Sequence, residues 1–413
     1  MQVGIVGKPS SGKSTLFSAA TLIDVAMASY PFTTIEPNKG VGFVRVDDAG
    51  NFFNVISNPK HGFLVQKETG NIRYVPVELI DVAGLVPGAS EGKGLGNKFL
   101  NDLSGADALI HVVDASGLTD EEGKVTTGHD PCKDIEFLEK EIELWFLKII
   151  ENNWTKFGKS HEKDFRKKVN LLAQNLSGVK ILDTHIEKAL KKLGIEEKML
   201  PDWNDEDKMN FATECRKQSK PIIIAANKCD LPTAEENIKK MKANFPEKTI
   251  VPCSAASELA LRKAAKQNIL EYYPGEKDFT IKGELNDKQK EGLETIRKNV
   301  LVKFGGTGIQ ECLDTTILKV LDYIPIFPGG TKTLKSKDGS YIPDCFLLKN
   351  GSTALDFAYT LHTDMGDGFI RAIDVKTKQI IGKDHILKSG DVIELMFNKR
   401  WILTKNCLNN MDK

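Results

Sequence analysis

Short apolar runs alternate with glycine-bearing, polar or helix-forming stretches along the first two thirds of the chain. The runs lie at residues 2–6, 74–81, 108–116, 221–227 and 249–253, and their length and composition predict buried β-strands. Buried strands that alternate with helices are typical of a mainly parallel sheet covered on both faces. The pattern therefore predicts an α/β fold.

A long connection separates the strand at 108–116 from the strand at 221–227. It runs for about a hundred residues, far more than one crossover helix needs. Apolar residues recur there at steps of three and four, which predicts amphipathic helices in an antiparallel hairpin or small bundle. They are Ile135, Leu138, Ile142, Trp145 and Ile149, then Phe165, Val169, Leu172 and Leu176, then Ile186, Leu190 and Leu193. We expect a helical insert at 118–215 within a domain formed by 1–117 and 216–323.

The pattern changes near residue 324, after a helix-forming stretch at 287–322. Short apolar runs separated by Gly and Asp flank one helix at 352–362, which Ser352 or Thr353 would cap. Several strands with a single helix indicate a small β-grasp, ubiquitin-like domain at 324–400, followed by a tail at 401–413. His362 has no nucleophile or carboxylate constellation around it, so we interpret it as a structural residue at the helix end.

Composition and charge narrow the function classes. The 413 residues carry 57 basic and 57 acidic side chains, so no bulk charge attracts nucleic acid or an anionic membrane. No apolar run approaches the roughly eighteen residues that span a bilayer, and Met1 to Val6 already reads as a strand rather than a signal peptide. The seven cysteines contain no C-x-x-C pair, which indicates reduced thiols rather than a zinc site. We expect a cytoplasmic protein with no membrane partner.

The stretch GIVGKPSSGKST at 4–15 has the order strand, glycine-rich loop, helix. Its spacing G-x-x-x-x-G-K-S is that of a P-loop, in which backbone N–H groups and a helix N-terminus face nucleotide phosphates. Lys13 would contact the β- and γ-phosphates and Ser14 would bind magnesium. The alternative is a chance match in a glycine-bearing turn, which the flanking strand and helix disfavour. The expected nucleotide-binding residues of this loop are Gly7, Lys8, Pro9, Ser10, Ser11, Gly12, Lys13, Ser14 and Thr15.

Two further groups follow the ends of predicted strands. Asp81 comes first, and its carboxylate is suited to hold magnesium through water, while the Gly84 amide is placed to meet the γ-phosphate. Ser254 and Ala255 follow the last buried strand, and their backbone would reach the guanine oxygen.

Asn227-Lys228-x-Asp230 selects the base. The Asp230 carboxylate would accept hydrogen bonds from N1–H and the exocyclic amine of guanine. Adenine lacks this donor pair and would leave the carboxylate unpaired at a cost of about 1–3 kcal/mol. Asn227 would orient the loop, and the Lys228 stem would cover one face of the ring. Guanine is therefore the predicted base.

Together these motifs resemble those of the Obg-related translation-factor GTPases, and within them the YchF/Ola-type subfamily in its archaeal-like form. Besides the Asn227–Asp230 box, the resemblance is carried by SYPFTTIEPNKGVG at 29–42, DVAGLVPGASEGKGLGNKFL at 81–100 and HTDMGDGFIRAID at 362–374. It covers nearly the whole chain. It implies a Ras-like P-loop domain with a helical insert and a C-terminal TGS domain, a module linked in this family to RNA or ribosome contacts.

The resemblance makes 29–42 the first switch, whose Thr34 would close on magnesium and the γ-phosphate, with Thr33 as the alternative. The glycine-rich stretch after Asp81 would be the second switch. The expected catalytic group is then Lys13, Thr34 and Gly84, and the expected metal ligands are Ser14, Thr34 and Asp81.

Two positions depart from related GTPases. Leu85 stands where many GTPases carry a glutamine that orients the attacking water, so we expect slow hydrolysis in the isolated protein. Ser10 stands where related proteins often carry an asparagine that helps to hold potassium, so a potassium requirement is left open.

We therefore expect a GTP-binding protein that slowly hydrolyses GTP to GDP with magnesium and acts as a nucleotide-dependent switch. Ribosome or RNA contacts would run through the TGS domain and the insert, whose lysine-rich helix faces are otherwise plain solvated surface. No long coiled-coil seam demands a dimer, so we expect a monomer. The alternatives are an ATP-hydrolysing member of the same subfamily, and an RNA-binding module whose nucleotide pocket is a sensor.

Overall fold

The computed structural model describes residues 1–21, 38–82, 84 and 102–398. Within these ranges the chain divides into two compact units: the first holds residues 1–21, 38–42 and the described part of 77–316, and the second holds residues 43–76 and 317–398. The boundaries fall within strands β2 (Lys39–Asp47) and β4 (Ile72–Asp81), so both strands contribute to both units. None of the helices in the described ranges is long and apolar enough to cross a membrane.

A largely parallel sheet contains most strands of the first unit, together with β3 (Phe63–Val65) and the parts of β2 and β4 that belong to the second. Its order is β2-β4-β1-β5-β6-β7, with β3 antiparallel to β4. The other strands are β1 (Gln2–Val6), β5 (Ala108–Asp114), β6 (Ile222–Asn227) and β7 (Ile250–Pro252). Parallel pairing joins β1 to β4 and β5, and joins β6 to β5 and β7. Every residue of β5 is buried, as a central strand covered on both faces requires. The predicted α/β fold with a mainly parallel sheet is confirmed.

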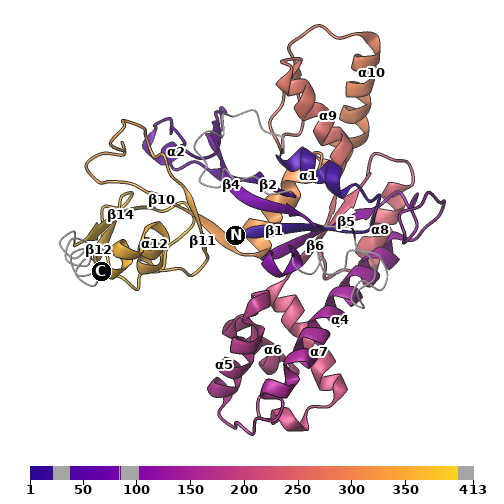
Figure 1. Cartoon of the computed structure of the whole chain (residues 1–413). Coiled ribbons are helices and arrows are strands. Elements are labelled where there is room, and N and C mark those ends of the chain that lie inside the picture. Colours follow the sequence, from indigo (N-terminus) through magenta and orange to yellow (C-terminus); the bar gives the residue numbers. More distant parts are fainter. Residues whose placement is uncertain (22–37, 83, 85–101, 399–413) are drawn as a thin grey trace, which may run out of the picture. The chain divides into compact units, whose positions relative to one another are not determined.

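Helices join these strands. α1 (Lys13–Thr21) follows β1 and packs against α9 (Ala255–Lys266), which follows β7 (Figure 1). α8 (Ala234–Asn244) connects β6 to β7. After α9 come the hairpin of β8 (Leu270–Glu271) and β9 (Thr280–Ile281), then α10 (Asp287–Ile296) and α11 (Ile309–Asp314). A small core beside α9 and α10 contains Leu261, Leu270, Tyr272, Phe279, Leu293 and Leu301.

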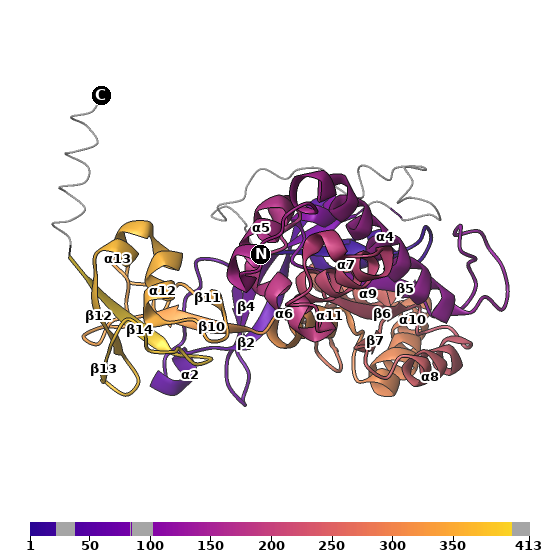
Figure 2. The ribbon, with the colours of Figure 1, turned by 90° about the horizontal axis from the view of Figure 1, so that it is seen from below.

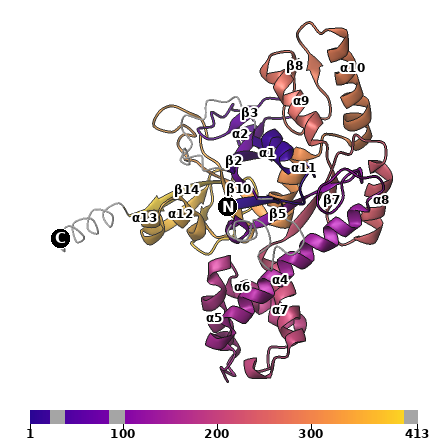
Figure 3. The same cartoon turned by 45° about the vertical axis from the view of Figure 1, so that its right-hand side comes forward.

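Four helices fill the long connection between β5 and β6 (Figure 3). They are α4 (Pro131–Phe157), α5 (Phe165–Leu176), α6 (Asp183–Leu193) and α7 (Asp205–Ser219). Their shared core includes Phe146, Leu172, Leu190 and Phe211, all fully buried. Of the positions expected on α4, the last one differs: Ile149 is half-buried, and its neighbour Ile150 is buried instead. The helix period of 3.6 residues does not match a strict alternation of steps of three and four.

A second sheet belongs to the second unit (Figure 2). Its order is β11-β10-β14-β12-β13, in which β10 is antiparallel to β11 and parallel to β14. The strands are β10 (Tyr323–Pro328), β11 (Phe346–Lys349), β12 (Phe369–Asp374), β13 (Ile380–Ile381) and β14 (Val392–Phe397). α12 (Ala354–Leu361) supplies Ala354 and Phe357 to the core on this sheet. This mixed sheet with one main helix is a β-grasp arrangement.

Side-chain caps fix the ends of the β-grasp helices. Thr353 accepts a hydrogen bond from the Asp356 N–H at 3.2 Å and so starts α12. His362 ends α12 and starts α13 (Thr363–Asp367), where its Nδ1 accepts from the Asp364 N–H at 3.1 Å. This cap agrees with a structural role for His362.

Arg73 ties the 43–76 segment to the C-terminal part of the second unit. Its fully buried guanidinium donates to the carbonyl oxygens of Ile342 at 2.8 Å and Pro343 at 2.5 Å. Asp48 lies 3.5 Å away and supplies the opposite charge. Burial lowers the pKa of Arg73, and the neighbouring acids oppose that shift. A helix-and-strand pattern carries no sign of this pairing, because the partners lie far apart in sequence.

We predict that Arg73→Met destabilises the chain by about 2–4 kcal/mol, because two buried carbonyls and Asp48 lose their partner. The matched control is Lys60→Met, which removes the exposed ion pair of Lys60 with Asp338 in the same unit. That pair contributes at most about 1 kcal/mol. Denaturant unfolding of both variants measures the difference, and equal losses would contradict the role given to Arg73.

Candidate nucleotide-binding site

The loop after β1 folds as a phosphate cradle because its glycines take conformations that other residues avoid. Gly7 has φ +149° and Gly12 has φ +95°. A Cβ on Gly7 would lie 2.4 Å from the Val112 carbonyl oxygen, and a Cβ on Gly12 would lie 2.2 Å from Asn227 Nδ2. Ser10 is also left-handed, at φ 59°. The backbone therefore passes close to β5 and β6 only with glycine at both positions.

The expected magnesium and phosphate ligands meet beside this loop. Lys13 Nζ donates to the Lys8 carbonyl oxygen at 2.8 Å, and Ser14 Oγ donates to Asp81 Oδ2 at 3.1 Å. Gly84 lies next to them, since a Cβ built on it would be 3.2 Å from Lys13 Nζ. Lys13, Ser14, Asp81 and Gly84 thus share one place at the carboxyl ends of β1 and β4.

Burial shapes the charges at this place. It lowers the pKa of Lys13 to about 8, although Asp81 opposes the shift. It also raises the pKa of Asp81, against the hydrogen bond from Ser14 and the charge of Lys13. A hydroxyl and a carboxylate oxygen next to each other suit Mg²⁺, which takes few protein ligands and completes its shell with water and phosphate oxygens. The residues present therefore fit that ion.

Asn227 joins three loops. Its Nδ2 donates to the Ser11 carbonyl oxygen at 2.9 Å, and its Oδ1 accepts from the Ala255 N–H at 3.0 Å. Ser254 caps α9 by accepting from the Ser257 N–H at 3.3 Å. One buried amide thereby holds the phosphate cradle, the end of β6 and the start of α9 in a fixed arrangement.

Asp230 follows on the same loop as Asn227. It is half-buried, and within the described ranges its carboxylate has no hydrogen bond or ion pair. A carboxylate placed in this way has all its acceptor positions available for donors of a ligand.

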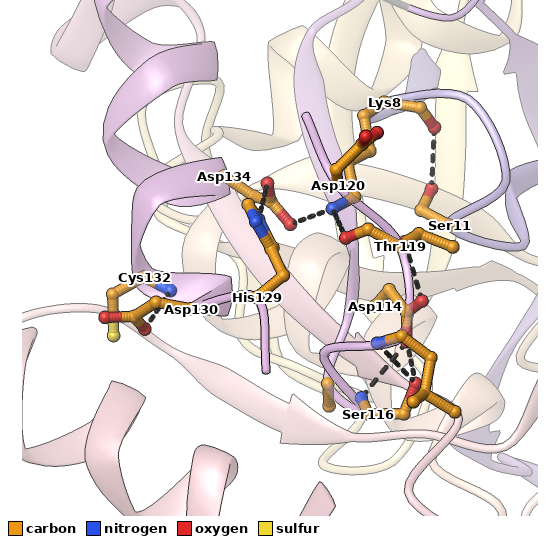
Figure 4. Close-up of polar contacts among 12 residues, drawn as sticks. Lys8, Ser11, Asp114, Ser116, Thr119, Asp120, His129, Asp130, Cys132 and Asp134 are labelled. Carbon is orange, nitrogen blue, oxygen red and sulfur yellow. Dashed lines mark hydrogen bonds and ion pairs between the residues drawn. The ribbon is translucent and has the colours of Figure 1, made fainter. Parts of the chain in front are cut away.

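Lys228 is held by a buried acid. It has φ 62°, and its Nζ donates to Asp114 Oδ2 at 2.7 Å. Asp114 also accepts from Ser116 Oγ at 2.5 Å and Thr119 Oγ1 at 2.7 Å (Figure 4). Burial acts to raise the pKa of Asp114, but the hydrogen bonds from Lys228, Ser116 and Thr119 hold it below its usual value.

Lys8 has two roles in the loop. Its carbonyl oxygen accepts from Lys13 and from Ser11 Oγ, whereas its buried ammonium lies 2.8 Å from Asp134 Oδ2 in the first turn of α4. The same ammonium donates to the Thr119 carbonyl oxygen at 2.7 Å (Figure 4). The expected nucleotide contact of Lys8 therefore falls to its backbone, while its side chain ties the loop to α4.

No motif marks Asp114, Thr119 or Asp134 in the sequence. One available signal is a charged residue at the end of the apolar run 108–116, because carboxyl ends of parallel strands are where ligands bind.

Pro9 lies beside the loop residue Gly123, because a Cβ built on Gly123 would be 2.6 Å from the Pro9 carbonyl oxygen. Thr15 is half-buried in α1. Thr34, Leu85 and most of both expected switches lie outside the described residues.

Three family profiles cover most of this chain. The 50S ribosome-binding GTPase profile matches residues 2–143, an Obg-like GTPase YGR210-like, G4 motif-containing domain matches 225–329, and the TGS domain matches 333–397. An uncharacterised GTP-binding protein of Methanocaldococcus jannaschii is 42% identical over 395 residues, covering 95% of this chain and 98% of that protein. The ribosome-binding ATPase YchF of Bacillus subtilis is 30% identical over 432 residues, covering 96% and 99%.

The chain belongs to the Obg-like GTPases of the YchF type. A crystal structure of a GTP-binding protein from Pyrococcus horikoshii OT3 shares this fold with a TM-score of 0.76 and 35% identity, covering 96% of this chain and all of that one. The resemblance read from the YPFTT, DVAG and NKCD motifs is confirmed, and so is the C-terminal TGS domain.

For this YchF-type chain we predict that Gly12→Ala abolishes the hydrogen bond from Asn227 to Ser11, since the new methyl group would overlap Asn227 Nδ2. The strained φ and the clash together cost about 1–3 kcal/mol. Nucleotide titration and denaturant unfolding measure the two effects. Gly292→Ala is the control, because open space surrounds Gly292 in α10 and alanine favours a helix. Unchanged affinity in Gly12→Ala would refute the cradle geometry.

Proposed function

We propose that this chain binds GTP with Mg²⁺, hydrolyses it slowly and changes conformation with the state of the nucleotide. The observation that carries the proposal is the Asn227 amide, which holds the phosphate cradle against the Ala255 loop and leaves the Asp230 carboxylate available beside it. In this arrangement the Asp230 carboxylate can accept hydrogen bonds from a guanine edge. The backbone N–H groups of the P-loop can donate to a triphosphate.

The roles of the residues follow from their places. On binding, the Lys13 ammonium would donate to a phosphate oxygen instead of to the Lys8 carbonyl oxygen. The negative phosphate would stabilise the charged form of Lys13, which burial disfavours. Ser14 and Asp81, with Thr34 by family resemblance, would hold the ion, which neutralises charge on the phosphates. The Gly84 amide would face the γ-phosphate. Leu85 orients no water, so hydrolysis stays slow until another group or a partner completes the site.

The partner class is proposed from the relatives. The proteins of Bacillus subtilis and Mycoplasma genitalium that resemble this chain over 96% of its length are named ribosome-binding ATPases. We propose that this chain also associates with ribosomes or RNA, through the TGS domain and the α4–α7 insert, as a cytoplasmic monomer.

ATP is the competing substrate, because the same relatives are named ATPases. The chain's own Asn227, Lys228 and Asp230 favour GTP, since adenine offers Asp230 no pair of donors. The competing function is an RNA-binding module that uses its nucleotide pocket only as a sensor.

We predict that GTP displaces ATP in competition, and that Asp230→Asn weakens GTP by about 1–3 kcal/mol because the guanine edge loses its acceptor. Titration of both nucleotides against both proteins measures this. Glu236→Gln, a substitution of an exposed carboxylate on α8, is the control and should bind like the unaltered chain. Tighter binding of ATP than of GTP by the unaltered chain would favour the ATPase instead.

We predict that Lys13→Ala loses the nucleotide dependence of ribosome binding, because the triphosphate no longer organises the switches. Co-sedimentation with ribosomes in the presence of GDP or a non-hydrolysable GTP analogue tests this. The unaltered chain should differ between the two nucleotides. Equal ribosome binding by the unaltered chain in both nucleotide states would contradict the switch and support the RNA-binding module.

A further inference from the structure

Asp114 is a buried charge at the carboxyl end of β5. The register of the sheet sets it beside Asn227 on β6, so the acid stands next to the base loop. It is fully buried, and a buried carboxylate is strongly unfavourable unless donors surround it. Its donors are Lys228 Nζ, Ser116 Oγ, Thr119 Oγ1 and the Ser116 N–H at 3.1 Å.

Lys228 is constrained at its backbone and at its ammonium. Its backbone is left-handed, which is uncommon for lysine, and its ammonium is pinned 2.7 Å from Asp114. The Lys228 side chain keeps 28% exposure although the Asp114 carboxylate has none, so part of this side chain stays accessible to a ligand. A free lysine side chain loses about 2 kcal/mol of rotamer entropy when it is fixed. Here Asp114 fixes the stem before any ligand arrives.

The loop that holds Asp114 is itself anchored. The Thr119 carbonyl oxygen accepts from Lys8 Nζ at 2.7 Å, and Lys8 pairs with Asp134, which His129 Nε2 contacts at 2.8 Å. Figure 4 shows these side chains pointing toward one another between the phosphate cradle and α4. Because the anchor belongs to the first turn of α4, Asp114 is not free to follow Lys228 if that lysine moves.

We propose that Asp114 is a positioning residue of the base site, acting through Lys228 by holding its stem where it covers one face of the guanine ring. This rests on the proposed binding of guanine nucleotides. The competing explanation is that Asp114 only satisfies the hydroxyls of Ser116 and Thr119 and leaves ligand affinity untouched.

The test compares GDP affinities in a double-mutant cycle. Asp114→Asn keeps the size of the side chain but loses its charge, and we expect about tenfold weaker binding of GDP, which is about 1.4 kcal/mol. Lys228→Met should cost at least as much. Because Asp114 acts through Lys228, the double variant should bind no more weakly than Lys228→Met alone. Asp120→Asn is the control, since Asp120 bonds only to the backbone of its own turn in the described structure.

The base analogue inosine diphosphate, which lacks the exocyclic amine, distinguishes an effect on the face of the base from an effect on its edge. Asp114→Asn should weaken GDP and inosine diphosphate by the same factor, because the stem covers the ring face and not the edge. Asp230→Asn should weaken GDP more than the analogue. A change in the ratio of the GDP affinity to the inosine diphosphate affinity in Asp114→Asn would overturn the proposal.

Thr119 keeps the proposal testable if Asp114→Asn does not fold. Thr119→Val removes one donor from the carboxylate oxygen that binds Lys228, and should weaken GDP, whereas Thr119→Ser should restore it. Normal GDP binding by Asp114→Asn or Thr119→Val, or additive losses in the cycle, overturns the positioning role alone. Absence of GDP binding by the unaltered chain overturns the proposed function and this proposal together.

Discussion

The Asn227 side chain is the interaction on which the site depends. A carboxamide has one donor and one acceptor face, and here both are used, toward Ser11 in the phosphate cradle and toward Ala255 at the start of α9. Asn227 is buried, so water cannot replace either hydrogen bond. Loss of one bond would therefore leave a buried polar group unpaired, at the cost of its desolvation. Gly12 has no side chain because Asn227 occupies that space.

The sequence predicted those parts of the fold whose signal is local. The strand at Gln2–Val6, the helix beginning at Lys13 and the runs that became β5, β6 and β7 follow from apolar content and flanking turn residues. Spacing sufficed for the P-loop because its geometry is set by neighbouring residues. The short strands β3 and β13 and the helix α7 were not anticipated, since β3 and β13 span only three and two residues, too few to show a period, and α7 is mostly polar.

Other features were out of reach for the same physical reason. Asp114 with Lys228, Lys8 with Asp134, and Arg73 with the carbonyls of Ile342 and Pro343 each join positions more than a hundred residues apart. A buried charge looks like any other charge in a sequence, and only the fold reveals which donors surround it. The grouping of residues 43–76 with the C-terminal β-grasp domain depends on such contacts.

The central claim is that the cradle, the base loop and the start of α9 receive one guanine nucleotide. A crystal structure of the chain grown with Mg²⁺ and a non-hydrolysable GTP analogue tests it most directly. The account predicts a guanine edge on the Asp230 carboxylate, one ring face against the Lys228 stem, and phosphates on the Gly7–Ser14 backbone with the ion at Ser14 and Asp81. A nucleotide bound away from Asp230, or with its phosphates outside that loop, would contradict it.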